Sequence, residues 1–396
     1  MKLWDKGTSV DQRIIDFTVG EDYRLDLKLL KYDCRASIAH AEMLGKIGIL
    51  SAKEVNALTR ELRHIATLAD AGKFEIGKAQ EDGHTAIENY LTEKLGETGK
   101  KIHTARSRND QVLTALRLFY KDELWDCGKS IRRLRKAIKS FVKQYGEIAI
   151  PGFTHTRKAM PSSVGMWAGA FADAMADNRR LLKVARELVD QSPLGTGAGY
   201  GVPLKIDRKF TAKRLGFARV QKNSVYAQNS RGKFESTILH ALTQIMADLN
   251  KISGDLILFS LPEFGFFELP AELCTGSSIM PQKQNPDVLE LVRSHYHTLL
   301  GFEVEIKSRM ANLISGYHRD MQLSKAPVMH GLQITADSLM MITLVFEKLR
   351  VNEANCQKGM TEELFATAEA YQLVKKGMPF RDAYREIGKR YRENKK

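Results

Sequence analysis

Apolar residues recur at three- and four-residue spacing along five long stretches of the chain, at about 110–145, 163–191, 233–259, 287–313 and 322–350. This spacing gathers apolar side chains on one face of an α-helix, so each stretch is predicted to be a long helix. The third stretch repeats Ile238, Leu242, Ile245, Leu249, Ile252 and Leu256 at alternating four- and three-residue steps, the pattern of a helix-bundle seam. The sequence contains no run of strands. The pattern therefore predicts an all-α fold with a long central helical bundle.

Two shorter regions flank the predicted bundle. The first hundred residues have the pattern of short helices joined by brief turns, and Ser51 with Glu54 has the spacing of a capping box before one of them. A small helical tail follows the last long helix. The sequence thus predicts an N-terminal helical domain at 1–106, a central long-helix domain at 107–350 and a short C-terminal helical domain at 351–396.

The net charge of the chain distinguishes only weakly between possible binding partners. The chain has 61 lysine and arginine residues against 47 acidic residues, a net charge of +14, and charges of both signs are interspersed as on solvated helix faces. A positive field attracts small polyanions as well as nucleic acid. We therefore expect no nucleic-acid partner, and a salt-dependent shift assay would test that alternative.

The cysteines and the hydropathy indicate the compartment. Cys34, Cys127, Cys274 and Cys356 are widely spaced, with no CxxC pair and no histidine–cysteine cluster at metal-ligand spacing. A reduced, cytoplasmic protein without a structural metal is the simplest interpretation. The first residues, Met1 to Lys6, carry no apolar signal region, and no segment is read as long and apolar enough to span a bilayer. We expect a soluble protein without a membrane partner.

The densest group of chemically useful side chains is the stretch from Thr275 to Asp287, between the third and fourth predicted helices. Its glycine and paired serines permit a mobile turn, whereas its two prolines restrict the backbone. Lys283 and Asn285 come just before a helix N-terminus, where backbone N–H groups favour an anion. The alternative interpretation is a polar loop that only joins two helices.

Similar polar stretches precede other long helices. Arg108 and Asn109 precede the first helix, in a run whose two guanidinium groups and amide suit carboxylate binding. A single histidine, His155, precedes the second helix, and the stretch from Tyr317 to Lys325 precedes the fifth. By contrast, the glycine-rich segment 195–201 follows a helix and lacks the lysine of a phosphate-binding loop, so we interpret it as a linker.

The order of these stretches predicts an oligomer. A helix of roughly 25 to 35 residues is about 40 to 50 Å long, and successive helix N-termini in an up-and-down bundle alternate between its two ends. The Asn109 and Lys325 stretches are then expected at one end, and those of His155 and Ser277 at the other. One chain cannot bring both groups onto one small molecule. A common site therefore requires several copies of the chain.

Three stretches resemble one protein family. The loop from Gly276 to Asp287 is similar to the GSSxMPxKxN motif of the fumarase, aspartase and argininosuccinate lyase superfamily. The run from Ala105 to Val112, which contains SRNDQV, and the run from Gly152 to His155 resemble the argininosuccinate lyases in particular. The similarity covers essentially the whole chain. It implies a homotetramer whose long helices form a twenty-helix core, with active sites drawn from several subunits and no cofactor or metal.

The resemblance also implies a reaction, the reversible β-elimination of argininosuccinate to arginine and fumarate in arginine biosynthesis. It makes Ser277 the general base, with an alkoxide that Lys283 and loop N–H groups stabilise, and His155 the second catalytic group. The implied substrate-binding residues are Asn109, Thr154, Tyr317, Gln322, Lys325, Arg108, Lys283, Asn285 and His84.

Four features depart from the family pattern. Ala105 stands where members usually have glycine, in a turn that could need positive φ, and Arg157 stands where they usually have glutamine. Asp22 lies near a position that often holds a substrate-binding serine, and the C-terminal region is short. Two alternatives follow. The protein is another fumarate-releasing lyase, such as an adenylosuccinate lyase, or a non-enzymatic member comparable to the crystallins.

Overall fold

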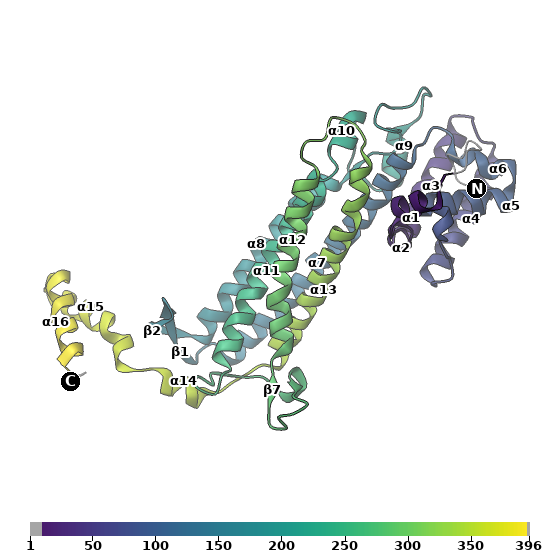
Figure 1. Cartoon of the computed structure of the whole chain (residues 1–396). Coiled ribbons are helices and arrows are strands. Elements are labelled where there is room, and N and C mark those ends of the chain that lie inside the picture. The colour runs from purple at the N-terminus through teal and green to yellow at the C-terminus, as the bar shows by residue number, and fades with distance from the viewer. Residues whose placement is uncertain (1–9, 394–396) are drawn as a thin grey trace. The chain divides into compact units, whose positions relative to one another are not determined.

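The computed structural model describes residues 10–393 and is predominantly helical, as the sequence predicts (Figure 1). All five predicted long helices are present, with bounds close to the predicted ones. They are α7 (Arg108–Tyr145), α8 (Val164–Val189), α11 (Lys233–Phe259), α12 (Asp287–Arg309) and α13 (Lys325–Lys348). The predicted absence of a signal region concerns Met1 to Lys6, which lie outside the described residues.

The chain forms two compact units. The first comprises Met1–Cys127, Leu181–Ala241 and Leu300–Leu332, and the second comprises Gly128–Arg180, Leu242–Leu299 and Gln333–Lys396. Each long helix contributes residues to both units. The division into domains at 1–106, 107–350 and 351–396 stays a prediction.

The first unit has a core of short helices near its N-terminus. They are α1 (Gln12–Val19), α2 (Asp22–Asp26), α3 (Leu30–Lys46), α4 (Ala52–Asp70), α5 (Gly83–Leu95) and α6 (Glu97–Lys100), with 3-10 turns at Lys78–Gln80 and Lys101–His103. Leu44, Leu62 and Leu91, from α3, α4 and α5, are completely buried in this core. The predicted capping box opens α4, since the Glu54 N–H donates to Ser51 Oγ at 3.3 Å and the Ser51 N–H donates to Glu54 Oε2 at 2.8 Å.

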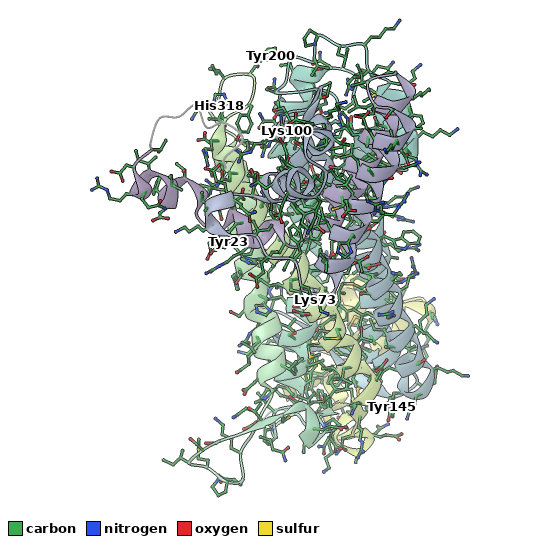
Figure 2. All side chains as sticks on the ribbon, turned by 90° about the vertical axis from the view of Figure 1, so that its right-hand side faces the viewer. Tyr23, Lys73, Lys100, Tyr145, Tyr200 and His318 are labelled. Carbon is green, nitrogen blue, oxygen red and sulfur yellow. The ribbon has the colours of Figure 1, made fainter. Side chains whose placement is uncertain are left out.

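The first unit also contains the glycine-rich segment 195–201 and several short elements besides its parts of the long helices. These short elements are the parallel pair β3 (Gln191–Ser192) and β4 (Arg219–Val220), α9 (Arg208–Arg214), α10 (Ser224–Asn229) and a 3-10 turn at Arg319–Ser324. The N–H groups of Gly195 and Gly197 donate to Asp110 Oδ2 at 2.8 and 3.0 Å, so this segment is bound to the start of α7. Tyr200 extends from it toward the loop that carries His318, and a Cβ added at Gly316 in that loop would lie 3.2 Å from the Tyr200 hydroxyl (Figure 2).

The second unit contains three antiparallel strand pairs. They are β1 (Ala149–Thr154) with β2 (Arg157–Ser163), β5 (Phe267–Glu268) with β8 (Arg350–Val351), and β6 (Thr275–Gly276) with β7 (Gln284–Asn285). The other elements are 3-10 turns at Ala271–Leu273 and Glu362–Phe365, and α14 (Glu353–Gly359), α15 (Ala366–Lys375) and α16 (Phe380–Glu393). Aromatic rings fill the core of this unit: the Trp167 and Phe267 ring centroids are 4.7 Å apart, and those of Phe141 and Phe346 are 5.5 Å apart.

Within residues 10–393, one helix has the length and composition of a membrane span, so the sequence expectation that no segment does is wrong by that criterion. It runs from Arg319 to Lys348, and half of its most apolar window is buried inside the structure. The core helix of a bundle has the same composition, because it buries apolar side chains against other helices rather than against lipid.

Candidate active site

The first unit contains a cleft of about 420 Å³ that is lined mainly by polar and charged residues. Its cationic side chains are Arg106, Arg108, Arg231, Arg319 and Lys325, and its carboxylates are Asp22, Asp26 and Asp82. The volume lies in the range of small-molecule sites, roughly 300 to 1,000 Å³. The mixture of charges suits a ligand that carries both carboxylates and cationic groups.

Six of the substrate-binding residues predicted from the sequence line this cleft. They are His84, Arg108, Asn109, Tyr317, Gln322 and Lys325. Asp82 caps α5 by accepting the Thr85 N–H at 2.8 Å, which places His84 in the first turn of that helix. Arg108, Asn109 and Lys325 begin α7 and α13. Three helix N-termini therefore border one cleft, and the positive ends of their dipoles favour an anion there.

Lys325 is buried and paired with two carboxylates. Its Nζ donates to Asp26 Oδ1 at 2.6 Å and to an Asp22 carboxylate oxygen at 2.9 Å. Burial lowers the pKa of Lys325, but the charges of Asp26 and Asp22 outweigh burial and raise the pKa above its ordinary value. Because Asp22 is also buried and shares this ammonium with Asp26, the pKa of Asp22 is raised.

His84 forms a second buried ion pair in the wall of the cleft. Its Nδ1 hydrogen-bonds to Asp33 Oδ2, and both side chains are buried. Burial lowers the pKa of His84, but the charges of Asp33, Asp82 and Asp26 outweigh burial and raise it. The pKa of Asp33 is lowered, since His84, Arg106 and Ser37 together outweigh the effect of burial. The other ring nitrogen of His84, Nε2, is buried and has no hydrogen-bond partner among the described residues.

The guanidinium of Arg108 is paired with the protein's own carboxylates. Its Nη1 donates to Glu81 Oε2 at 3.4 Å, and its Nη2 donates to Asp82. These bonds hold the start of α5 beside the start of α7. A substrate carboxylate would compete with both acidic side chains for Arg108, so its predicted role in substrate binding stays a prediction.

The remaining cleft residues differ in whether their side chains already form hydrogen bonds within the protein. Gln322 Nε2 donates to the Thr18 carbonyl at 2.9 Å, so this amide is held by α1. The side-chain amide of Asn109 has no hydrogen-bond partner within residues 10–393, and the Tyr317 side chain is 38% exposed. Asn109 and Tyr317 are therefore the two predicted residues that are most available to a ligand.

The other five predicted site residues, Thr154, His155, Ser277, Lys283 and Asn285, lie in the second unit. The loop of Ser277 is closed at its base by β6 and β7, in which Thr275 pairs with Asn285 and Gly276 with Gln284. Lys283 lies in this exposed loop and Asn285 closes it, just before α12, as the sequence predicts.

Ser277 Oγ accepts backbone hydrogen bonds inside its own loop. The N–H groups of Ile279 and Met280 point at this oxygen, at 3.3 and 3.1 Å. Two N–H donors on one hydroxyl oxygen favour its alkoxide over the neutral hydroxyl. Two loop N–H groups thus contact the Ser277 oxygen. The stabilisation of its alkoxide by these groups and Lys283, and its role as a base, stay predictions.

His155 lies at the tip of a hairpin that the sequence analysis did not predict. Thr154 pairs with Arg157, so His155 and Thr156 form a two-residue turn between β1 and β2. Both have positive φ, 52° and 57°, as a type I′ turn requires. Asparagine or glycine usually occupies such positions. A strained, exposed histidine at a hairpin tip is typical of a functional position.

The structure also adds residues that the sequence analysis did not select. Asp26 and Asp33 hold Lys325 and His84, and Arg231 lines the cleft. The position of Arg231 just before α11 is a signal in the sequence, because the other selected stretches also precede long helices. The acidic residues Asp26 and Asp33 give no such signal, since an aspartate is usually exposed.

Metal ligation is not evident in the described part of the chain. Within residues 10–393, no group of three or more histidine, cysteine, aspartate or glutamate side chains is placed to hold a metal ion. The cleft side chains instead offer ion pairs and hydrogen bonds to an organic ligand.

Ala105 has a φ of 59°, so the turn before Arg106 does need the left-handed region. An alanine there is strained, because its Cβ approaches the following carbonyl. We expect Ala105→Gly to raise the free energy of unfolding by about 0.5 to 1 kcal/mol. Glycine relieves the backbone strain, and its greater conformational entropy in the unfolded chain offsets part of this gain. Urea unfolding of both proteins measures this change.

The matched variant Ala105→Val should have the opposite effect, because a β-branched side chain is still less compatible with positive φ. Equal stability of the glycine, alanine and valine proteins would show that the turn relaxes and stores no strain.

Comparison with known proteins places the chain in a family. A family model described as Lyase matches residues 8–301. The argininosuccinate lyase of Thermotoga neapolitana is 53% identical over 394 residues, which cover 100% of this chain and 99% of that protein. The argininosuccinate lyase of Sorangium cellulosum is 43% identical over 98% of this chain and 90% of its own length.

Solved structures show the same fold at low sequence identity. An EDDS lyase in complex with formate has a TM-score of 0.81 and 22% identity, and the match covers 96% of this chain and 76% of that one. The class II fumarase of Schistosoma mansoni has a TM-score of 0.79 and 17% identity, over 94% of this chain and 91% of that one.

The chain therefore belongs to the lyase family and is an enzyme of that class. Within this family it groups with the argininosuccinate lyases, to which it is similar along its whole length.

Proposed function

We propose that the protein catalyses the reversible β-elimination of argininosuccinate to arginine and fumarate, in arginine biosynthesis in the cytoplasm. The observation that carries the proposal is the meeting of His84, Asn109, Lys325 and three other predicted residues in one cleft of mixed charge. Argininosuccinate carries several carboxylates together with a guanidinium and an ammonium group. Its charges therefore complement those of the cleft, and the 53% identical relative is named for this activity.

In the proposed reaction a base removes a proton from the carbon beside a succinyl carboxylate. The adjacent carbon–nitrogen bond then breaks, fumarate leaves, and the departing guanidine nitrogen takes up a proton. Negative charge develops on the carboxylate, so donors fixed before the reaction lower the barrier. We assign this task to Lys283, Asn285 and the N-terminus of α12, which follows them directly.

We assign proton removal to Ser277 and assistance to the leaving nitrogen to His155. An ordinary serine hydroxyl is too weak a base at neutral pH, and the two N–H groups on Ser277 Oγ support its ionisation. Closure of the loop around substrate would exclude water and strengthen these contacts. Thr154, next to His155 at the end of β1, would bind substrate.

We further propose a homotetramer with active sites shared between subunits. Large apolar side chains stay exposed on the long helices of the single chain, among them Met166 at 72%, Leu291 at 61% and Met340 at 57%. Exposed apolar helix faces are typical of surfaces that pack against other subunits.

Light scattering measures the number of subunits in the assembly. Mixed tetramers of Ser277→Ala and Asn109→Ala chains should recover activity that neither variant has alone.

Fumarate release from purified protein tests the proposed reaction. We expect release from argininosuccinate and none from adenylosuccinate, because the cleft offers carboxylates to the cationic arginine half. Release from adenylosuccinate alone would assign the other lyase activity. Release from neither substrate would favour a non-enzymatic family member.

Arg157 departs from the glutamine that relatives usually carry and follows the His155 turn directly. It is exposed and forms no ion pair within the described residues. We expect Arg157→Gln to leave kcat unchanged or to raise it up to about threefold, since glutamine is the residue that relatives usually carry at this position. Steady-state kinetics with argininosuccinate check this. A fall of about tenfold or more would show that the arginine itself contacts the substrate.

A further inference from the structure

Two facing residues, Phe153 and Lys158, come just before the tip of the β1–β2 hairpin that carries His155. Directly opposite side chains in an antiparallel pair lie on the same face of the hairpin. The Phe153 ring centroid lies 5.6 Å from that of Phe259 and 6.2 Å from that of Phe264. Phe153 thus holds one strand of the hairpin, close to its tip, against the aromatic core of the second unit.

Lys158 holds the other strand through its ammonium group. Its Nζ donates to the Gly359 carbonyl at 2.7 Å and to Thr361 Oγ1 at 3.4 Å. Both acceptors lie about two hundred residues further along the chain, between α14 and the 3-10 turn that follows it. Lys158 therefore bonds the hairpin to the C-terminal part of the same unit.

The segment that accepts these bonds is itself held against β1. A Cβ added at Gly359 would lie 3.4 Å from Pro151 Cδ and 2.9 Å from the Phe266 ring, so the Gly359 backbone packs closely against both residues. The Leu364 N–H donates to the Thr361 carbonyl at 3.1 Å. Lys158 is thus bonded to a packed segment rather than to a free loop.

The hairpin tip needs such support for two reasons. The ladder shifts register between Gly152 and Phe153, which leaves Ala159 as an extra residue on β2. A bulge of this kind lets a strand bend, and only two residue pairs separate it from the turn. Both turn residues also have positive φ, and strained backbone of this kind persists only where the surrounding structure determines it.

We propose that Lys158 is a positioning residue, which holds His155 where the reaction requires it by bonding the hairpin to Gly359. The inference rests on the proposed function, in which His155 assists the departure of the guanidine nitrogen. Lys158 acts through His155 and does not touch the substrate. A displacement of about 1 Å can lower a rate by about a hundredfold, so a bond three residues from His155 should affect turnover measurably.

The test uses the full chain and the variant Lys158→Met, which keeps the apolar stem and removes the donor. We expect kcat for fumarate release to fall about tenfold, with the KM for argininosuccinate changed by less than about threefold. Most of the assigned binding residues lie outside the hairpin, which is why KM should change less. Lys158→Arg retains a donor for the carbonyl and should keep kcat within about threefold of the unchanged protein.

A double-mutant cycle with His155→Asn separates positioning from structure. Asparagine tolerates positive φ, so this variant keeps the turn and removes the imidazole. If Lys158 acts through His155, Lys158→Met should lower kcat by less than about twofold in the His155→Asn chain. A general loss of structure would lower kcat by the same factor in both chains.

Lys348→Met is the matched control. Lys348 is also a partly exposed lysine of the second unit, and its Nζ lies 2.8 Å from Glu272 Oε2. Neither residue belongs to the hairpin or to the segment that Lys158 contacts. The control variant should therefore keep kcat within about twofold.

The proposal is overturned if Lys158→Met keeps kcat within about twofold, or if its loss is the same with and without His155. If Lys158→Met does not fold, the same cycle with Lys158→Gln decides, and failure of both to fold would make the lysine structural. Failure of the proposed function is distinguishable. It appears as absent fumarate release from the unchanged protein, or as normal turnover by His155→Asn, and either result also removes the basis of the inference.

Discussion

Replacing Ser277 by alanine is expected to reduce argininosuccinate turnover by about a thousandfold or more. A positioned general base contributes roughly 10² to 10⁴ to a rate, and the proposed reaction has no other assigned group to remove the carbon-bound proton. The fold should be unaffected, since Ser277 Oγ only accepts two N–H groups within its own loop. Fumarate release at saturating substrate and thermal unfolding measure the two effects.

Ser278→Ala is the matched control. Ser278 is the adjacent, exposed serine of the same loop, so its variant should keep turnover within about threefold. Near-normal turnover of Ser277→Ala would remove the assigned base. Equal losses in both variants would indicate that the loop needs hydroxyl groups for its conformation rather than for proton transfer.

Asp33→Asn is expected to lower the free energy of unfolding by about 3 kcal/mol. Breaking a buried ion pair costs roughly 3 to 5 kcal/mol, and neutralisation of His84 keeps the effect near the lower limit. Asp33 and His84 are both buried and directly hydrogen-bonded. Urea unfolding of the two proteins at pH 6 measures the difference.

The stability that the Asp33–His84 pair contributes depends on pH in a direction that follows from the two pKa shifts. The pKa of His84 is raised in the folded protein, so the stability it contributes is present below its unfolded pKa of about 6.5 and is lost as the pH rises through the folded value. The pKa of Asp33 is lowered, so its contribution is present above about pH 4 and is lost as the pH falls further. The difference between Asp33→Asn and the unchanged protein should therefore be greater at pH 6 than at pH 9.

Glu88→Gln serves as a control for this experiment. Glu88 accepts from His103 Nδ1 at 3.0 Å, but the histidine is 39% exposed, so the change should cost less than about 1 kcal/mol. A similar small cost for Asp33→Asn, without pH dependence, would contradict the assignment of a charged His84.

Much of the candidate site could be predicted because its residues lie in long motifs at helix starts. Arg108, Asn109 and Lys325 were predicted at helix N-termini and begin α7 and α13. The His155 hairpin was not predicted. Its turn residues are histidine and threonine rather than the asparagine or glycine that marks a type I′ turn, so the local sequence does not favour it.

The sequence by itself determined the helices of this protein, since the spacing of apolar residues along a stretch is a local property that sets which face is buried. It also determined the family, through motifs that extend from Ala105 to Asp287. Only the tertiary structure decided which charges are already satisfied. Arg108 and Lys325 are held by acidic residues far away in the chain. Ion pairing depends on the distances between side chains that only folding brings together. These distances cannot be inferred from the spacing of residues along the chain.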